Sequence, residues 1–369
     1  MTDQPKITTI EELSDYLYAA LQLEHATIPP YLTALYSLHP GSNPDALRLI
    51  RVVAVEEMLH LTLVANVMNA VGIKPDLTQD GFVPRYPARL PDGEQDFQVS
   101  LQPFSKAAVS TFLKIERPAK APSEQARLVR RSPRLHASAS ASASASPHAH
   151  LLAVNPRDPE MQFYSIGEFY EEIIRGVQYL HAQYAAHGKE LFTGDPRRQV
   201  TPDYYYSGGG QVIPVTGLQS ALDALSLIAG QGEGLGGGIY DAEGELAHYY
   251  RFQQLEIGRY YQKGDQPGHP TGPALDTDWD AVYPVLTDAR LDNYPEGSEL
   301  RAAAVRFNEI YADFLDFLTS AYNGQPELLI EAVWRMFRIR DAMLVLIRNP
   351  VPGRTGVNAG PTFDVAAAP

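Results

Sequence analysis

Glutamate and histidine recur in this sequence at a spacing that suits metal binding. Glu57 and His60 stand three residues apart, and Glu245 and His248 repeat that spacing. Residues three apart share one face of a helix, so each pair can direct a carboxylate and an imidazole at the same ion. Di-metal bundles use two such pairs and a single glutamate from each of two further helices. The two pairs therefore predict a two-metal site.

The apolar pattern places three of these side chains in the predicted core. Glu24 continues the helical stripe that contains Leu21 and Ile28, and Glu57 and His60 continue the stripe of the next predicted helix. A carboxylate inside an apolar seam is costly unless it is paired or binds a cation. A common metal site explains why these groups share neighbouring stripes.

The predicted hairpin brings Glu24 and Glu57 to the same level. Their midpoint falls between Pro40 and Gly41, inside the turn expected over residues 39–43. With an equal rise per residue in two antiparallel helices, the two carboxylates are expected to face each other.

The remaining glutamate of the expected site has two candidates. Glu171 lies on a long predicted helix that begins near Ser165, beside its main apolar stripe. Glu233 closes a shorter predicted helix and is separated from Glu245 by a short loop. The pattern favours Glu171, because a long helix is the usual bundle element, and Glu233 is kept as its rival.

Amphipathic patterns predict a mainly α chain that forms a four-helix bundle with extra C-terminal helices and long irregular insertions. We expect a single domain over residues 1–369, with an irregular insertion over 73–117, in which we place no chemistry, and a low-complexity linker or loop over 118–160. Helices are expected over residues 9–38, 43–71, 165–188, 217–232 and 241–261, with additional helices between 299 and 347.

Composition narrows the classes of function. The chain has no cysteine, which excludes disulfides, thiolate zinc sites and cysteine-ligated clusters, so any metal must be held by Glu, Asp or His. The formal net charge of −14 argues against a nucleic-acid partner. The N-terminus has no signal-peptide pattern and no apolar run is long enough to cross a membrane, so we expect a cytoplasmic protein without a membrane partner.

The sequence resembles a known family at the residues that carry this chemistry. The resemblance rests on LEHATIPPYLTALYSL (23–38), VEEMLHLTLVANVMNAVG (55–72), SIGEFYEEI (165–173), QGEG (231–234) and ELAHYYRF (245–252). These stretches look like the ferritin-like domain of the iminophenyl-pyruvate dimer synthase type, found in enzymes of violacein and indolocarbazole biosynthesis. The resemblance implies a ferritin-like fold, with Glu24, Glu57, His60 and His248 as site residues. It also strengthens the case for Glu233 as a ligand, because QGEG looks like a family motif.

These observations predict a metal-dependent oxidase or oxygenase, and the resemblance implies that it acts in specialised metabolism. Two metal ions, iron or else manganese, would act with dioxygen on a small organic substrate. The resemblance adds a reaction that couples imines derived from aromatic amino acids, although the pathway synthases are much longer proteins. The alternative is a non-catalytic bundle that binds metal or a partner. Storage fits less well, because the length and the large loops do not suit a compact cage subunit.

Overall fold

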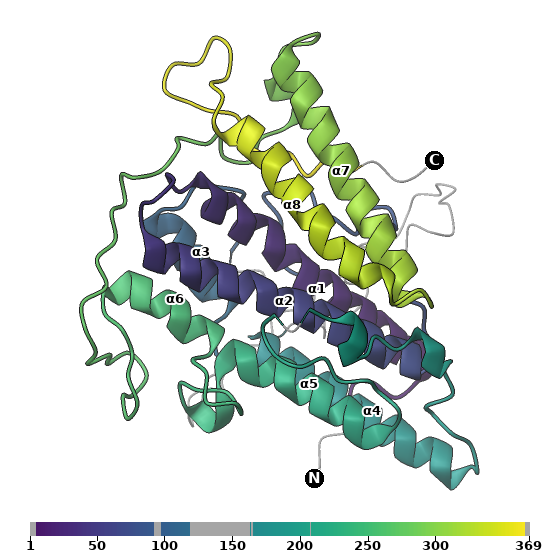
Figure 1. Cartoon of the computed structure of the whole chain (residues 1–369). Helices are drawn as coiled ribbons and strands as arrows, with labels where there is room; N and C mark the ends of the chain where they lie inside the picture. Colours follow the sequence, from purple (N-terminus) through teal and green to yellow (C-terminus); the bar gives the residue numbers. More distant parts are fainter. Residues whose placement is uncertain (1–4, 92–96, 119–162, 164, 207, 366–369) are drawn as a thin grey trace, which may run out of the picture.

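The chain folds into a mainly helical structure (Figure 1). This computed structural model describes residues 5–91, 97–118, 163, 165–206 and 208–365, so nearly all of the expected 118–160 linker lies outside the described residues. Within these ranges, β-type pairing between backbone segments is limited to isolated bridges. The eight α-helices of the described residues are α1 (Ile10–Ser37), α2 (Pro44–Ala70), α3 (Lys106–Ile115), α4 (Ile166–Ala186), α5 (Leu218–Glu233), α6 (His248–Ile257), α7 (Glu299–Tyr322) and α8 (Leu328–Ile347).

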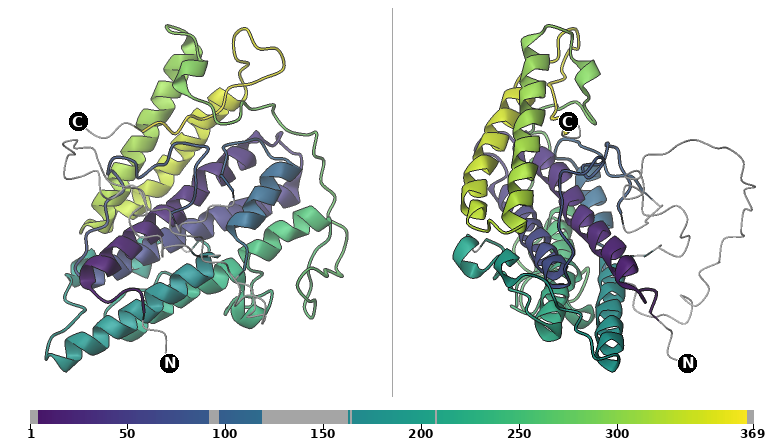
Figure 2. Two further views of the ribbon diagram at one scale, coloured as in Figure 1. Left: turned by 180° about the vertical axis from the view of Figure 1, so that it is seen from behind. Right: turned by 90° about the vertical axis from the view of Figure 1, so that its right-hand side faces the viewer.

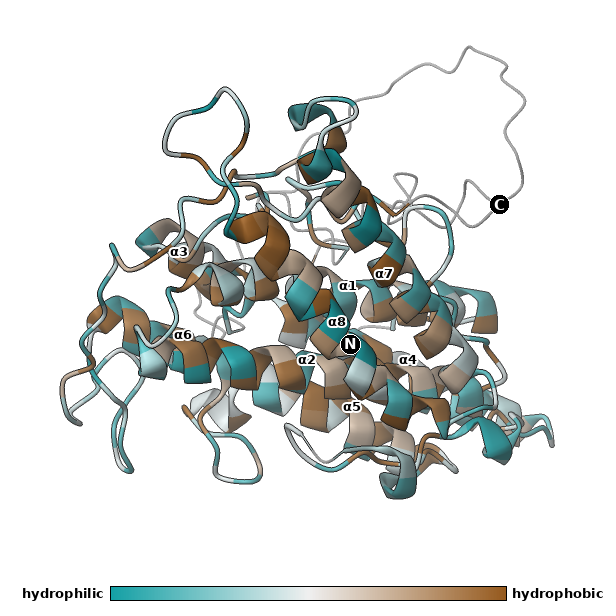
Figure 3. Cartoon of the chain, turned by 45° about the horizontal axis from the view of Figure 1, so that its top comes forward, coloured by the Kyte–Doolittle hydropathy of each residue, from teal (hydrophilic) through white to brown (hydrophobic). Residues whose placement is uncertain are grey.

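The hairpin of α1 and α2 forms the centre of the molecule. Helices α4 and α5 pack on one side of it, and α7 and α8 pack on the other (Figures 1 and 2). Hydrophobic and hydrophilic residues alternate along α7 and α8, as expected for helices with one buried face (Figure 3). The predicted helical bundle with additional C-terminal helices is confirmed. No helix within the described ranges is both long and apolar enough to cross a lipid bilayer.

Two sides of the bundle are each built from two shorter helices. Helices α4 and α3 both contact α1, whereas α5 and α6 both contact α2. Helix α3 also packs along α6, and α4 packs along α5. The ends of the four shorter helices therefore meet beside the middle of the long hairpin, which is where Glu24 and Glu57 lie.

Helix α6 is shorter than the pattern predicted. It begins at His248 rather than near Asp241. The Asp241 carboxylate accepts hydrogen bonds from the backbone N–H groups of Glu243 and Glu245, at 2.9 and 2.8 Å, and Gly244 has a φ of 81°. Such side-chain bonds compete with helix formation, so a turn replaces the first expected helical residues.

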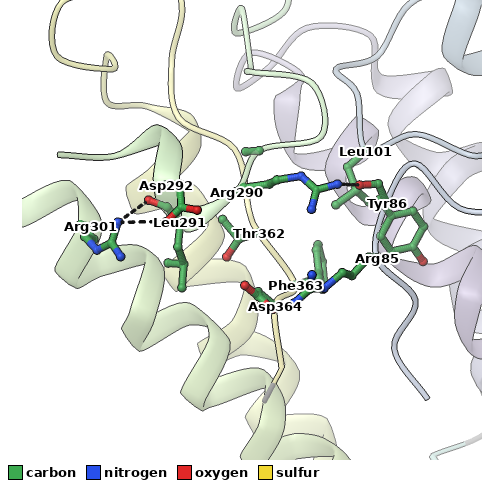
Figure 4. Close-up of a pocket in the computed structure, with 11 residues that line it drawn as sticks. Arg85, Tyr86, Leu101, Arg290, Leu291, Asp292, Arg301, Thr362, Phe363 and Asp364 are labelled. Atoms are coloured by element: carbon green, nitrogen blue, oxygen red, sulfur yellow. Dashed lines mark hydrogen bonds and ion pairs between the residues drawn. The ribbon is translucent and has the colours of Figure 1, made fainter. Parts of the chain in front are cut away.

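Helix α1 continues through two prolines, Pro29 and Pro30. Pro30 has no N–H to donate to the carbonyl of Ala26. The Tyr86 hydroxyl donates to that carbonyl at 2.8 Å instead. Arg290 in turn donates to the Tyr86 carbonyl at 3.2 Å, beside a pocket of about 180 Å³ (Figure 4). Contacts from distant segments therefore complete the backbone of α1 close to Glu24.

Replacing Tyr86 with phenylalanine tests this contact. We expect Tyr86→Phe to lower the free energy of unfolding by about 1 kcal/mol or somewhat more, because the buried Ala26 carbonyl loses its donor. Urea unfolding followed by circular dichroism measures the change. The matched control is Tyr184→Phe, since the Tyr184 hydroxyl has no hydrogen-bond partner in the described part of the chain. Equal losses in both variants would contradict the assignment.

Candidate metal centre

Five buried side chains form two overlapping groups in the middle of the bundle. Glu24, Glu57 and His60 make one group, and Glu57, Glu116 and His248 make the other. Within each group, one nitrogen or oxygen atom per residue lies within 4.8 Å of the others. All five residues are at most 3% exposed. Glu57 belongs to both groups and therefore connects them.

The five residues come from the long hairpin and from the ends of the shorter helices. Glu24 lies in the middle of α1, and Glu57 and His60 lie in the middle of α2. Glu116 follows the last residue of α3, where its N–H donates to the Phe112 carbonyl at 3.0 Å. His248 is the first residue of α6. The junctions between the short helices thus supply the side chains that the hairpin lacks.

The hydrogen bonds of His60 fix which ring nitrogen carries its hydrogen. Gln231 Nε2 donates to the Gly209 carbonyl at 3.0 Å, which turns Gln231 Oε1 towards His60 Nε2, 2.8 Å away. An amide oxygen only accepts, so Nε2 carries the hydrogen. His60 Nδ1 then faces Glu24 at 3.1 Å and Glu57 at 3.8 Å. A neutral ring would point a lone pair at two carboxylates, so this geometry requires a proton or a metal ion between Nδ1 and the carboxylates.

His248 repeats the arrangement. Its Nε2 lies 2.9 Å from the Glu56 carboxylate, which Arg251 approaches at 3.4 Å. Its Nδ1 lies 3.1 Å from Glu57 and 3.4 Å from Glu116, yet makes no hydrogen bond with any described residue. Metal-binding imidazoles are commonly held by a carboxylate in this way, with the second nitrogen left for the ion.

Two buried tyrosines hold the outer carboxylates. The Tyr170 hydroxyl donates to Glu24, and the Tyr31 hydroxyl donates to Glu116. Burial raises the pKa of both phenols well above the ordinary value, so they remain donors. Each hydroxyl bonds to one carboxylate oxygen, and the other oxygen lies among the groups that surround Glu57.

The pKa values of three cluster residues indicate that the cluster lacks positive charge. Burial raises the pKa of Glu24 to about 7. Burial alone would lower the pKa of His60, but hydrogen bonds with Glu24 and Glu57 raise it to about 10. The pKa of His248 is also raised, because the nearby carboxylates outweigh its burial. All three groups hold protons more tightly, so the oxygen and nitrogen donors fit a divalent cation that would replace those protons.

Two other predicted ligands lie outside both groups. Glu171 is exposed on α4, whereas its neighbour Tyr170 faces the cluster. One residue turns a helix by about 100°, so the two side chains point in different directions. Glu245 precedes α6, and its side chain is 67% exposed and lies 3.6 Å from Arg251. The Glu-x-x-His spacing does not bring Glu245 to His248, because these residues do not share a helix.

Glu233 binds the backbone of a helix end instead of joining either group. Its carboxylate accepts the Gly167 N–H at 2.6 Å. Gly167 lies in the first turn of α4, where a negative charge interacts favourably with the helix dipole. A Cβ on Gly167 would lie 2.5 Å from this carboxylate. Glu233 thus joins the end of α5 to the start of α4.

Glu116 was not identified from the sequence, because no chemistry was placed in residues 73–117. The structure shows a helix there, and Ser105 caps it by accepting the Ala108 N–H at 3.1 Å. Val109 and Phe112 form a buried stripe, and Glu116 continues it four residues later. The criterion that identified Glu24 would therefore have found Glu116 once this short helix was recognised.

Comparisons with known proteins agree on the fold. A family model described as ferritin-like matches residues 17–257. Dichlorochromopyrrolate synthase from Lentzea aerocolonigenes is 27% identical over 341 residues, which cover 86% of this chain but 29% of that protein. The chain thus spans less than a third of this curated relative's length. The crystal structure of a ferritin-like protein from Caulobacter vibrioides has a TM-score of 0.56 and 23% identity, and the alignment covers 92% of this chain and 96% of that one.

Competition between protons and metal gives a pH prediction. The pKa of His60 is raised from 6.5 to about 10, so its proton stabilises the metal-free fold below pH 6.5, and this stabilisation is lost as pH rises through about 10. A metal ion at Nδ1 must displace that proton. We expect Mn²⁺ affinity to rise with pH across this window and binding to release protons.

Calorimetric titration in buffers of different ionisation enthalpy measures the released protons. The exposed His187, at the end of α4, supplies the control. His187→Gln should release as many protons as the unchanged protein. An affinity that falls as pH rises would contradict the prediction.

Proposed function

The chain belongs to the ferritin-like family, and from this premise we propose that its buried cluster holds two iron ions and that the protein is an oxidase or oxygenase acting on a small organic substrate. The observation that carries the proposal is the position of Glu57, which belongs to both groups of candidate ligands. Glu57 would therefore help to hold both ions. Manganese accepts the same donors and is the second choice of metal.

Each ion would be held by one outer carboxylate and one imidazole in addition to Glu57. Glu24 and His60 Nδ1 supply one such set, and Glu116 and His248 Nδ1 supply the other. These oxygen and nitrogen donors are of the kind that non-haem iron sites use. Iron bound there would supply the one-electron chemistry that reactions with dioxygen need.

The surrounding residues position and shield the ligands. Tyr170 and Tyr31 hold the outer carboxylates, and Gln231 and Glu56 orient the two imidazoles. The ligands are nearly inaccessible to water, and a low local dielectric strengthens the interaction between a cation and its carboxylates. These features support preorganised binding, because little of the site would need to move when the ions enter.

The curated relative suggests the kind of substrate. Dichlorochromopyrrolate synthase carries a related sequence, and the matched region makes up 29% of that protein. We infer that this chain acts on an organic substrate within specialised metabolism, and coupling of imines derived from aromatic amino acids is the specific reaction proposed for testing. The alternative function is a bundle that binds metal or a partner without turnover.

Metal analysis of matched glutamate variants tests the ligand set. After anaerobic loading with Fe²⁺ and removal of free metal, we expect about two iron ions per chain in the unchanged protein. Glu57→Ala should lose both, and Glu116→Ala should lose at least one. The exposed Glu171→Ala and Glu245→Ala should retain both. Iron that persists in Glu116→Ala but is lost from either control would disprove the proposed set. Elemental analysis and circular dichroism measure content and folding.

Dioxygen consumption tests turnover separately from binding. The iron-loaded protein should consume dioxygen faster when an imine freshly generated from an aromatic amino acid by an amino-acid oxidase is supplied. Catalase and an oxidase-only control remove the background. Tyr170→Phe should retain iron but lose about 10- to 100-fold in rate, because a group that positions a ligand is absent. Full iron occupancy without consumption under any of these conditions would favour the non-catalytic alternative.

A further inference from the structure

A larger cavity lies between the α1–α2 hairpin and the α7–α8 pair. Its volume is about 580 Å³, and most of its lining side chains are apolar. This volume lies within the range of small-molecule sites. The cavity lies on the side of the hairpin that α7 and α8 cover, whereas the candidate metal centre faces the ends of α3 and α6. His25 and Met58 line the cavity, whereas Glu24 and Glu57 belong to the cluster.

The cavity is elongated along α1. Its lining includes α1 residues from His25 to Tyr36, a span of 11 residues (36 − 25). At a rise of 1.5 Å per residue this span corresponds to about 16 Å. Apolar residues such as Ile28, Leu32 and Leu35 lie between these two positions and line the cavity. An elongated apolar body can follow this lining along α1.

The end of the cavity near His25 is deeply buried and carries no charge. His25 Nε2 lies 2.8 Å from the Tyr311 hydroxyl, and Thr62 Oγ1 lies 3.0 Å from the Tyr322 hydroxyl. Burial lowers the pKa of His25 to about 3, so its ring is neutral. His25 Nδ1 has no hydrogen-bond partner among the described residues. This end therefore suits the uncharged part of a ligand.

Two arginines lie at the other end. Arg51 and Arg340 both line the cavity near Tyr36. Burial raises the pKa of the Tyr36 phenol, the two arginine charges lower it, and the Asp341 carboxylate, which does not line the cavity, raises it. Arg51 is exposed and makes no ion pair within the described ranges. Arg340 pairs with Asp341 at 2.9 Å, but both side chains are substantially exposed, so the pair is weak. No acidic residue is found among the described residues that line the cavity.

We propose that this cavity binds an elongated apolar carboxylic acid, with its carboxylate between Arg51 and Arg340 and its body directed towards His25. Guanidinium groups pair with carboxylates through charge-assisted hydrogen bonds, and the apolar lining removes the body of the ligand from water. The ligand is separated from the metal centre by the α1–α2 hairpin. It is therefore an additional bound molecule rather than the substrate of the proposed oxidation.

Calorimetric titration of the full chain with three probes tests the proposal. Decanoate and 6-phenylhexanoate carry the expected head group on an acyl and an aromatic body, and decyltrimethylammonium carries the opposite charge on the same chain as decanoate. We expect at least one acid to bind at least about tenfold more tightly than the cation. The acid that binds more tightly identifies the body that the cavity prefers. Failure of both acids to bind, or equal binding of the cation, would overturn the proposal.

Arginine variants locate the head group. Arg51→Met and Arg340→Met keep an apolar stem and remove the charge, so each should weaken binding of the acid by about tenfold. Arg338→Met is the matched control, because Arg338 is exposed on α8 and does not line the cavity. Equal loss in Arg338→Met and Arg340→Met would contradict the site.

A separate pair of variants distinguishes this site from the metal centre. Ala332 lines the cavity and is 3% exposed, so Ala332→Phe should fill the space and abolish acid binding while iron content is unchanged. Glu57→Ala should lose iron and still bind the acid. Loss of acid binding in Glu57→Ala, with circular dichroism unchanged, would show that the acid binds at the metal centre and would overturn the proposal.

Discussion

The burial of Glu57 between two histidines is the constraint on which the rest of the structure depends. Its carboxylate lies near His60 on one side and His248 on the other, and two further carboxylates complete the cluster. Three buried carboxylates with two neutral imidazoles would carry a large negative charge in a low-dielectric interior, which is strongly unfavourable. Protons relieve this charge in part, and a pair of divalent cations would relieve it more completely.

The division of two bundle sides into short helices follows from what the cluster needs. A continuous helix has all its central backbone groups paired internally and presents side chains at fixed angles. Here Glu116 directly follows the last residue of α3, and His248 is the first residue of α6. The same junction lets Glu233 bind the first turn of α4 and lets Gln231 reach His60. The helices are thus interrupted where the candidate ligands lie together.

The sequence predicted the parts of this site that lie within long regular helices. Glu24, Glu57 and His60 stand in phase with extended apolar stripes, and the turn between the helices set their relative level. Glu116 and the turn before His248 depend on a ten-residue helix and on the Asp241 side chain, which periodicity over long windows does not capture. Residues 170 and 171 show how far helical periodicity can be used to choose a ligand. Tyr170 is buried and Glu171 is exposed, so a shift of one residue changes which side chain faces the cluster. The cavity beside α7 and α8 requires tertiary packing and has no local signal.

The paired prolines of α1 also determine where this helix can sit relative to its neighbours. The carbonyl that Pro30 leaves without an intrahelical donor is paired only where the Tyr86 hydroxyl can reach it. A shift of α1 along its axis by one turn would move this carbonyl about 5.4 Å from its partner. It would also carry Glu24 away from the level of Glu57. The prolines therefore help to fix the axial position of α1. Only that position pairs the free carbonyl with Tyr86, and the same position keeps Glu24 level with Glu57.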